Sequence, residues 1–210
     1  MPKLESRLLL VTDRHQTNGR PLVSLLKRVL TVGAPVIQLR ERDLSARDLL
    51  ALAFEVQTAA APCGSRLVIN DRIDVALALA GAGVHLRSNS LPLSVARRLV
   101  GEQRLLGVSA HSVAEAVQAE SQGADYVVLG PVYDTPSKQA YGPPLGLQQV
   151  EEVCRLVRIP IIGIGGVTAA RARELRRAGA YGVAVITAIC GAADVEAAVH
   201  AMFDAVTSSS

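Results

Sequence analysis

The chain has 210 residues, half of them apolar and a fifth charged, so it is long enough to bury the core of one domain and is neither disordered nor fibrous. Four Tyr, two Phe and no Trp leave few aromatic faces, which argues against the base-stacking platforms of single-strand nucleic-acid binders. The formal charge is +3 with the basic residues scattered, which favours a small anionic substrate over a nucleic acid.

The cysteines and the N-terminal segment indicate the compartment. Cys63, Cys154 and Cys190 are odd in number and far apart, and their spacing matches neither a disulfide framework nor a zinc site. The apolar stretch before Thr12 is too short for a signal sequence or a membrane span. We therefore expect a cytoplasmic protein with no membrane partner.

Short apolar runs rich in Val, Ile and Leu recur along the chain, and each is followed by a stretch with helical periodicity. This alternation predicts parallel strands joined by helices. Because the runs are continuously apolar, both faces of the sheet must be covered. The predicted strands are Leu8 to Thr12, Val36 to Leu39, Leu67 to Asn70, Gly83 to Leu86, Leu105 to Ser109, Tyr126 to Leu129, Ile161 to Ile164 and Gly182 to Ile186.

Capping residues mark helix starts at Ser45, Ser112 and Thr168. Eight units of about 26 residues predict a compact, closed, single-domain (β/α)8 TIM barrel over residues 1–210, with a frayed tail at 207–210. An open doubly wound sheet is the alternative, since periodicity does not distinguish closure from an open edge. The segment Gly163–Gly166 does not match the dinucleotide fingerprint.

In such a barrel the site lies at the carboxyl ends of the strands. Gly165 and Gly166 after the seventh predicted strand, with Ile186 and Thr187 after the eighth, predict a phosphate site, because backbone N–H groups at glycines and helix starts attract anions. The alternative is that the glycines only form a tight turn.

A second candidate cluster is Gln38, Arg40 and Arg42, which alternation along an extended segment sends to one side. An amide and two guanidiniums suit a carboxylate or a phosphate. The alternative is that Arg40 pairs with a carboxylate inside the barrel, such as Asp71.

Further candidates end other strands. His111, with Ser109 beside it, can exchange protons near neutral pH. His85 lies within a buried strand, which is typical of a histidine satisfied by protein partners. Asn70 and Asp71 end the third strand, and Asp71 is a single carboxylate that suits magnesium only weakly.

The long loop 134–144 is expected to lie over the ligand. Lys138 is its candidate phosphate contact, with plain solvation as the alternative, and Thr135 and Ser137 supply hydroxyl groups.

Seven of these segments, in order, resemble one family. The chain from about Leu8 to Ile189 is similar to the thiamine phosphate synthase and thiazole tautomerase (TenI-like) family, which implies a closed barrel acting on thiazole phosphate. The segments are Gln38–Arg42, Ile69–Asp71, Gly83–Leu86, Gly107–His111, Leu129–Tyr133, Thr135–Lys138 and Gly163–Thr168.

The family holds two activities. The synthase couples hydroxymethylpyrimidine diphosphate to thiazole phosphate, with Mg²⁺ stabilising the departing pyrophosphate. The resemblance places a basic residue at Arg42, a metal ligand at Asp71, and pyrimidine or pyrophosphate contacts at Gln38, Arg40, Asn70, Asp71, Ser109, Thr135, Ser137 and Lys138. The chain departs from this pattern at Arg87–Ser90, where the synthase has an acidic magnesium ligand.

The tautomerase aromatises a carboxythiazole phosphate and needs no cofactor. The resemblance makes His111 its general acid/base, with Arg40 holding the carboxylate and Ser109 nearby. Because the acidic metal ligand is missing, the sequence favours the tautomerase. The synthase, a non-catalytic regulatory or binding protein, and another phosphate-binding barrel such as a sugar-phosphate isomerase are the alternatives. The sequence does not determine the oligomeric state, and a homodimer is one possible state.

Overall fold

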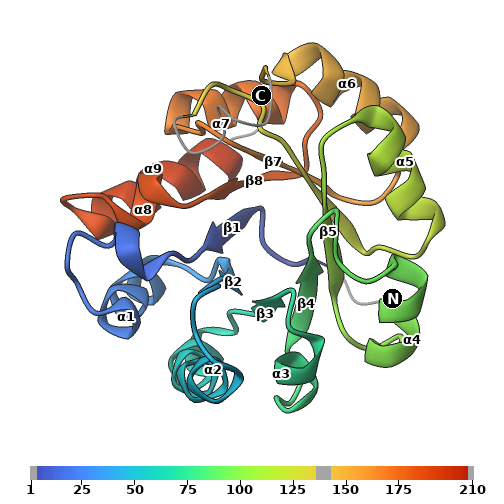
Figure 1. The fold of residues 1–210 in the computed structure, drawn as a ribbon. Coiled ribbons are helices and arrows are strands. Elements are labelled where there is room, and N and C mark those ends of the chain that lie inside the picture. Colours follow the sequence, from blue (N-terminus) through green and yellow to red (C-terminus); the bar gives the residue numbers. More distant parts are fainter. Residues whose placement is uncertain (1–3, 136–142, 208–210) are drawn as a thin grey trace.

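The computed structural model describes residues 4–135 and 143–207, and within them eight parallel strands close into a barrel in the order β1 to β8. Figure 1 shows these strands around the centre of the molecule with the helices outside them. The strands are β1 (Leu8–Val11), β2 (Val36–Leu39), β3 (Leu67–Asn70), β4 (Gly83–Leu86), β5 (Leu106–Ala110), β6 (Tyr126–Leu129), β7 (Ile161–Ile164) and β8 (Gly182–Val185).

The predicted (β/α)8 barrel is confirmed, and the open doubly wound sheet is wrong. Closure is made by β8 pairing with β1, with Val183 opposite Leu8. All eight predicted strands are present, and the ends of three of them shift by one residue.

The helices that connect the strands begin where the capping residues predicted. Ser45, Ser112 and Thr168 are N-caps, and each side chain accepts a hydrogen bond from a backbone N–H in the first turn. The helices are α1 (Leu22–Val32), α2 (Ala46–Ala60), α3 (Ile73–Leu77), α4 (Leu93–Val100), α5 (Val113–Ser121), α6 (Gly146–Leu156), α7 (Ala169–Arg177), α8 (Thr187–Cys190) and α9 (Val195–Thr207), with 3-10 turns η1 (Arg14–Gln16) and η2 (Ala61–Cys63).

Two apolar layers hold the barrel together. The larger layer lies between strands and helices, and the smaller one fills the barrel with inward-facing side chains such as Leu9, Val36, Val68 and Ile162. Because side chains along a strand alternate, the residue two positions after each of these points to the same interior. This alternation determines which polar groups reach the mouth of the barrel.

The amino-terminal end of the barrel carries a buried ion pair. Asp125, which precedes β6, accepts hydrogen bonds from the Arg97 guanidinium at 2.7 Å and from the Leu106 backbone N–H at 2.7 Å. The Arg97 and Asp125 side chains are only 12% and 2% exposed. This pair ties α4 to the start of β5 and β6.

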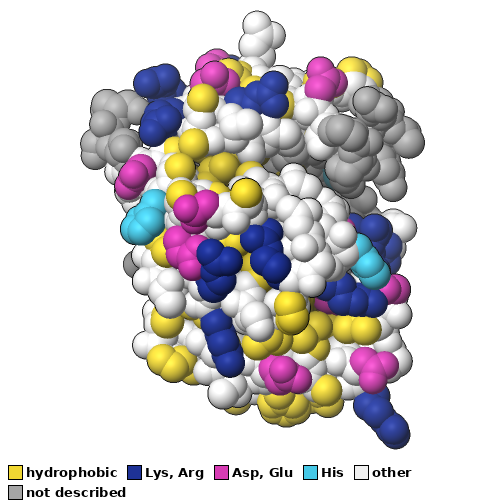
Figure 2. Space-filling model, turned by 90° about the vertical axis from the view of Figure 1, so that its left-hand side faces the viewer, with side chains coloured by type: hydrophobic (Ala, Val, Ile, Leu, Met, Phe, Trp, Pro, Cys, Tyr) yellow, Lys and Arg dark blue, Asp and Glu magenta, His cyan; other side chains and the backbone are white. Residues whose placement is uncertain are grey.

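The surface has mixed charge. Figure 2 shows a face on which basic and acidic side chains lie next to one another. Arg28 of α1 forms an ion pair with Glu196 of α9, which joins these two helices.

No helix in the described ranges is long and apolar enough to cross a membrane. Thr207 ends α9, and the rest of the predicted tail, 208–210, lies outside the described residues.

Candidate active site

A polar layer caps the apolar interior of the barrel. Gln38 of β2 and Asn70 of β3 follow the inward-facing Val36 and Val68 by two positions, and the Gln38 amide Nε2 donates to Asn70 Oδ1 at 3.0 Å. The other amide atom, Gln38 Oε1, is buried without a hydrogen-bond partner among the described residues. A buried oxygen that lacks a hydrogen-bond donor in the protein is a candidate position for a hydrogen bond from a ligand.

His85 of β4 continues this layer. Its Nδ1 is hydrogen-bonded to the Tyr126 hydroxyl at 3.1 Å and its Nε2 to the Ser109 hydroxyl at 3.0 Å. Complete burial lowers the pKa of His85 to about 3, so the imidazole is neutral at physiological pH. Both ring nitrogens have protein partners, so a direct contact with substrate would require one of these bonds to break.

Tyr126, which contacts His85, was missed in the sequence reasoning. Its ring is fully buried inside the barrel, and a Cβ added at Gly107 of β5 would overlap it. Burial raises the pKa of the Tyr126 hydroxyl, so this group stays protonated. A glycine within a predicted central strand was the available signal, because such a glycine indicates a close approach by another group.

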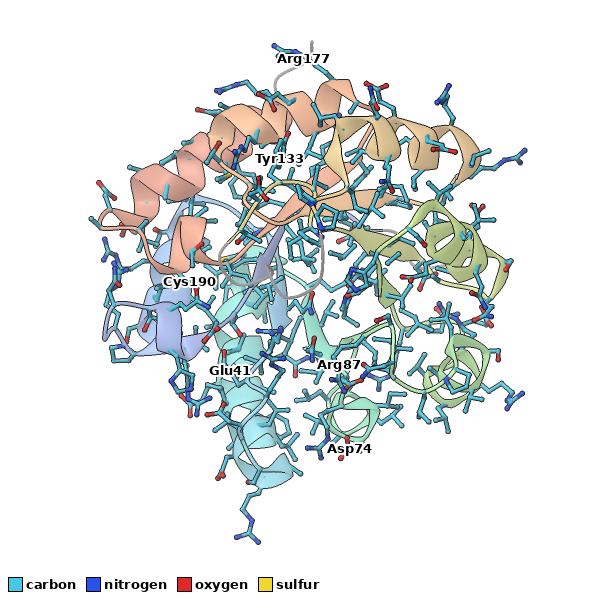
Figure 3. All side chains as sticks on the ribbon, turned by 45° about the horizontal axis from the view of Figure 1, so that its top comes forward. Glu41, Asp74, Arg87, Tyr133, Arg177 and Cys190 are labelled. Atoms are coloured by element: carbon cyan, nitrogen blue, oxygen red, sulfur yellow. The ribbon has the colours of Figure 1, made fainter. Side chains whose placement is uncertain are left out.

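An arginine-lined cleft lies beside this layer at the carboxyl ends of β2, β3 and β4. It has a volume of about 180 Å³, and Arg42, Arg72 and Arg87 line it together with Asp71. Figure 3 labels Glu41 and Arg87, which both line this cleft. The predicted alternation from Gln38 to Arg42 ends early, because β2 stops at Leu39.

Asp71 is held by neighbours other than the one predicted. Arg87 Nε and Nη2 donate to Asp71 Oδ2 at 2.8 and 2.5 Å, and the Ser90 hydroxyl donates to Asp71 Oδ1. The alternative pairing of Asp71 with Arg40 is therefore wrong. The backbone of Asp71 lies in the left-handed region with φ of 64°, and its N–H donates to the His85 carbonyl at 2.8 Å.

Arg40 is half-buried next to the cleft. Its guanidinium has no hydrogen bond or ion pair within residues 4–135 and 143–207. Burial, followed by the nearby Arg42 charge, lowers the pKa of Arg40, although a guanidinium remains protonated in proteins. A half-buried cation of this kind is suited to an anionic ligand.

Glu41 positions Arg40, a role that the sequence reasoning did not assign. The buried Glu41 carboxylate accepts hydrogen bonds from the Thr12 hydroxyl at 2.6 Å and from the Arg14 backbone N–H at 3.1 Å. Thr12 Oγ1 in turn accepts a bond from the Arg40 backbone N–H at 3.0 Å. The chain leaving β2 is thereby fixed to the chain leaving β1.

The predicted phosphate site lies at β7 and β8, across the barrel from the cleft. Gly165 and Gly166 have φ of 98° and 63°, and added Cβ atoms would lie 2.7 Å from Pro131 and 2.6 Å from the Asp134 carbonyl. The loop after β6 therefore requires glycine at both positions, whatever binds there. Ile186 is the N-cap of the short helix α8, and Thr187 is exposed in its first turn.

The remaining predicted residues are more scattered. His111 is exposed after β5, and its Nδ1 donates to the Gly130 carbonyl at 2.5 Å. Thr135 is half-buried in the loop after β6. Ser137 and Lys138, with most of the expected lid, lie outside the described residues.

The predicted Mg²⁺ ligand, Asp71, does not fit a metal as it stands. Both carboxylate oxygens already accept bonds, from a guanidinium and a hydroxyl. Within the described ranges there is also no group of three or more His, Cys, Asp or Glu residues that could hold a metal ion. Hard divalent cations are usually bound through free carboxylate oxygens together with substrate oxygens.

Together, the closed barrel and the polar layer define a (β/α)8 barrel whose candidate site lies at the carboxyl ends of the strands, where enzymes of this fold have their active sites. The family model described as "Thiamine monophosphate synthase" matches residues 8–189. The chain belongs to this family, whose members are enzymes of thiamine biosynthesis.

Relatives and a solved structure agree with this assignment. A thiamine-phosphate synthase of Moorella thermoacetica is 43% identical over 207 residues, covering 99% of this chain and 98% of the relative. One from Roseiflexus sp. is 44% identical, covering 94% of this chain and 84% of the relative. The structure of thiamine phosphate pyrophosphorylase from Pyrococcus furiosus has a TM-score of 0.86 at 32% identity, covering 95% of both chains.

These names match the alternative that the sequence left open, the synthase, better than the tautomerase that it favoured. The tautomerase was preferred because an acidic residue is missing at Ser90. The missing acidic residue counts against a synthase only if a metal ion must supply the positive charge. In this structure the Arg87 guanidinium already supplies positive charge at Asp71.

Proposed function

We propose that the chain is a thiamine-phosphate synthase, which joins hydroxymethylpyrimidine diphosphate to thiazole phosphate and releases pyrophosphate. The observation that carries the proposal is the arginine cleft, where Arg42 and Arg87 lie near Arg40. Three guanidiniums exceed what one carboxylate or one phosphate needs, and they suit a diphosphate. The glycine turn after β7 and the start of α8 lie on the other side of the mouth and serve the single phosphate.

The proposed step needs stabilisation of a leaving group. The thiazole nitrogen forms a bond to the pyrimidine methylene carbon, and the bond from that carbon to the diphosphate oxygen breaks, so that pyrophosphate leaves with the electron pair. Arg40, Arg42 and Arg87 neutralise the negative charge that develops on it. Gln38 Oε1, the orphaned acceptor, takes a hydrogen bond from an N–H group of the pyrimidine.

The direct test is a coupling assay with both substrates and detection of pyrophosphate. We expect release that requires both substrates, and we expect Arg40→Gln to lower kcat/KM by about 100-fold or more, as loss of a charged donor to a leaving group does. Arg98→Gln, which changes an exposed arginine on α4, is the matched control and should retain the wild-type rate.

A second assay separates the two family activities. His111→Ala should leave coupling within about threefold, because this side chain is outside the charged cleft and is bonded to Gly130. Absence of coupling, together with conversion of carboxythiazole phosphate that is lost in His111→Ala, would overturn the synthase proposal in favour of the tautomerase.

A further inference from the structure

The region where β3 and β4 end has an unusual charge arrangement for a site that handles pyrophosphate. Two carboxylates line the cleft, and Glu41 is bonded to Thr12 and Arg14. Both oxygens of the other, Asp71, accept bonds, Oδ2 from the Arg87 guanidinium and Oδ1 from the Ser90 hydroxyl. A divalent cation would have to displace Arg87 to reach Oδ2. Arg87 therefore already balances the charge of Asp71.

The turn that carries Arg87 is built for this pairing. The Arg87 backbone N–H donates to Ser90 Oγ at 2.9 Å, and the Ser90 N–H donates to the Arg87 carbonyl at 3.1 Å. These reciprocal bonds hold the guanidinium and the hydroxyl on the same side, against Asp71. A carboxylate at position 90 would face Asp71 as a like charge unless a cation stood between them.

Arg87 also has capacity to bind a ligand. Its side chain is 45% exposed and lines the cleft, while Asp71 is 24% exposed. A guanidinium has five N–H donors, and the contacts with Asp71 use two of them, from Nε and Nη2. The remaining donors, including those on Nη1, can reach phosphate oxygens in the cleft while Asp71 holds the side chain in place.

We propose that Arg87 replaces the divalent cation of a diphosphate site, so that this chain binds and expels pyrophosphate through Arg40, Arg42 and Arg87 without a metal ion. Arg40 and the charged residues that line the cleft, three arginines and two carboxylates, sum to a formal charge of +2, which is the charge of one such ion. This inference rests on the proposed function for the coupling step, whereas the pyrophosphate site itself can be tested without catalysis.

The first measurement is calorimetric titration of the full-length protein with inorganic pyrophosphate in EDTA. We expect the wild type to bind, and we expect Arg87→Ala to bind at least about tenfold more weakly, with Arg98→Ala as the matched control that binds as the wild type does. Absence of wild-type binding in EDTA, or equal binding by Arg87→Ala, overturns the proposal. Equal thermal unfolding of the variants shows that the comparison is between folded proteins.

The second measurement is the coupling rate with EDTA and with Mg²⁺. We expect wild-type rates within about twofold of each other, since the guanidiniums already supply the charge. The double variant Arg87→Ala with Ser90→Asp exchanges the guanidinium for a second carboxylate, and its coupling should rise at least about tenfold on adding Mg²⁺.

The outcomes separate the two proposals. Wild-type coupling that stops in EDTA and returns with Mg²⁺ overturns the role of Arg87 and leaves the synthase in place. No coupling under either condition, with pyrophosphate binding in EDTA that depends on Arg87, overturns the synthase and supports the metal-free site.

Discussion

His85 shows how burial decides what a residue does. A histidine with two protein partners inside a barrel is locked as a neutral hydrogen-bonding group, and its low pKa removes it from acid/base chemistry at physiological pH. Its function in this structure is to hold Ser109 and Tyr126 in place. Ser109, at the carboxyl end of β5, is the member of this set that is partly accessible.

This burial predicts a pH-dependent stability. The folded pKa of His85 is about 3, below the value of 6.5 in the unfolded chain, so the unfolded state takes up a proton first as the pH falls. Stability from this residue is full above pH 6.5 and declines by roughly 1.4 kcal/mol for each pH unit between 6.5 and 3.

Urea unfolding at pH 7.5 and pH 5 measures the effect. We expect His85→Gln to be less stable at pH 7.5, through the lost bonds, and to lose less additional stability at pH 5 than the wild type. His200→Gln, at an exposed position on α9, is the control and should follow the wild-type pH dependence. Identical pH dependence in all three proteins would contradict the assignment.

At the scale of elements, the backbone conformation of the turn after β7 is constrained by its packing against the chain that leaves β6. Gly165 and Gly166 pack against the chain that leaves β6, where Tyr133 in turn donates its hydroxyl to Glu174 of α7 at 2.8 Å. The Tyr133 N–H also donates to the Gly165 carbonyl at 3.2 Å. The glycine turn after β7 and the loop after β6 are thus one packed unit.

Alanine substitutions separate backbone conformation from packing. Gly81 has φ of 71° with open space around it, so Gly81→Ala should cost only the conformational penalty, about 1 kcal/mol. Gly165→Ala adds the overlap with Pro131 and should cost at least about 1 kcal/mol more. Denaturant unfolding measures the free energy of unfolding of both variants. Equal decreases would contradict the prediction and would show that the loop after β6 moves away from the added methyl group at little cost.

At the scale of the whole molecule, the two ends of the barrel divide stability from chemistry. The amino-terminal end buries the Arg97–Asp125 pair, and Arg104 there donates to three carbonyls around α3 and β4, those of Ala76, Leu79 and Ala82. The carboxyl-terminal end carries half-buried and exposed arginines around an open cleft. Asp125 and Arg104 are bonded within the protein at the first end, whereas Arg40 and Arg87 have N–H donors available at the second.

This division predicts opposite effects of two substitutions. Asp125→Ala removes the only carboxylate that the buried Arg97 guanidinium contacts among the described residues, although its carbonyl partners remain, and it leaves the Leu106 N–H without its acceptor. It should therefore lower the free energy of unfolding by about 3 kcal/mol. The fraction that remains folded should keep the wild-type kcat. Arg40→Gln should do the reverse, with stability within about 1 kcal/mol of wild type and activity lost. Denaturation together with kinetics on the same samples tests both, and a catalytic defect in folded Asp125→Ala would contradict the division.

Local patterns determined the strands, their connecting helices and the strand ends where polar residues lie, whereas the closure of the barrel rested on the number of strand–helix units and the family resemblance. Continuous apolar runs of strand length, capping residues and repeated strand–helix units are short-range signals, so all eight strands and three N-caps could be predicted. Gln38, Asn70 and Ser109 could be placed at or near strand ends, and His85 within a strand, because the apolar runs indicate where each strand lies. The same residues carried the resemblance to the family.

Only the tertiary structure decided which polar groups pair. Asp71 with Arg87, Glu41 with Thr12, and His85 with Tyr126 each join different strands or strand ends, and no local pattern chooses between one guanidinium and another across a barrel mouth. That choice depends on closure, register and the direction in which each strand exits. The preference for the tautomerase followed from the missing acidic residue in the segment Arg87–Ser90, because the sequence does not show that the Arg87 guanidinium lies against Asp71. Composition and periodicity therefore specify the scaffold, whereas long-range geometry specifies the charge arrangement on which the chemistry depends.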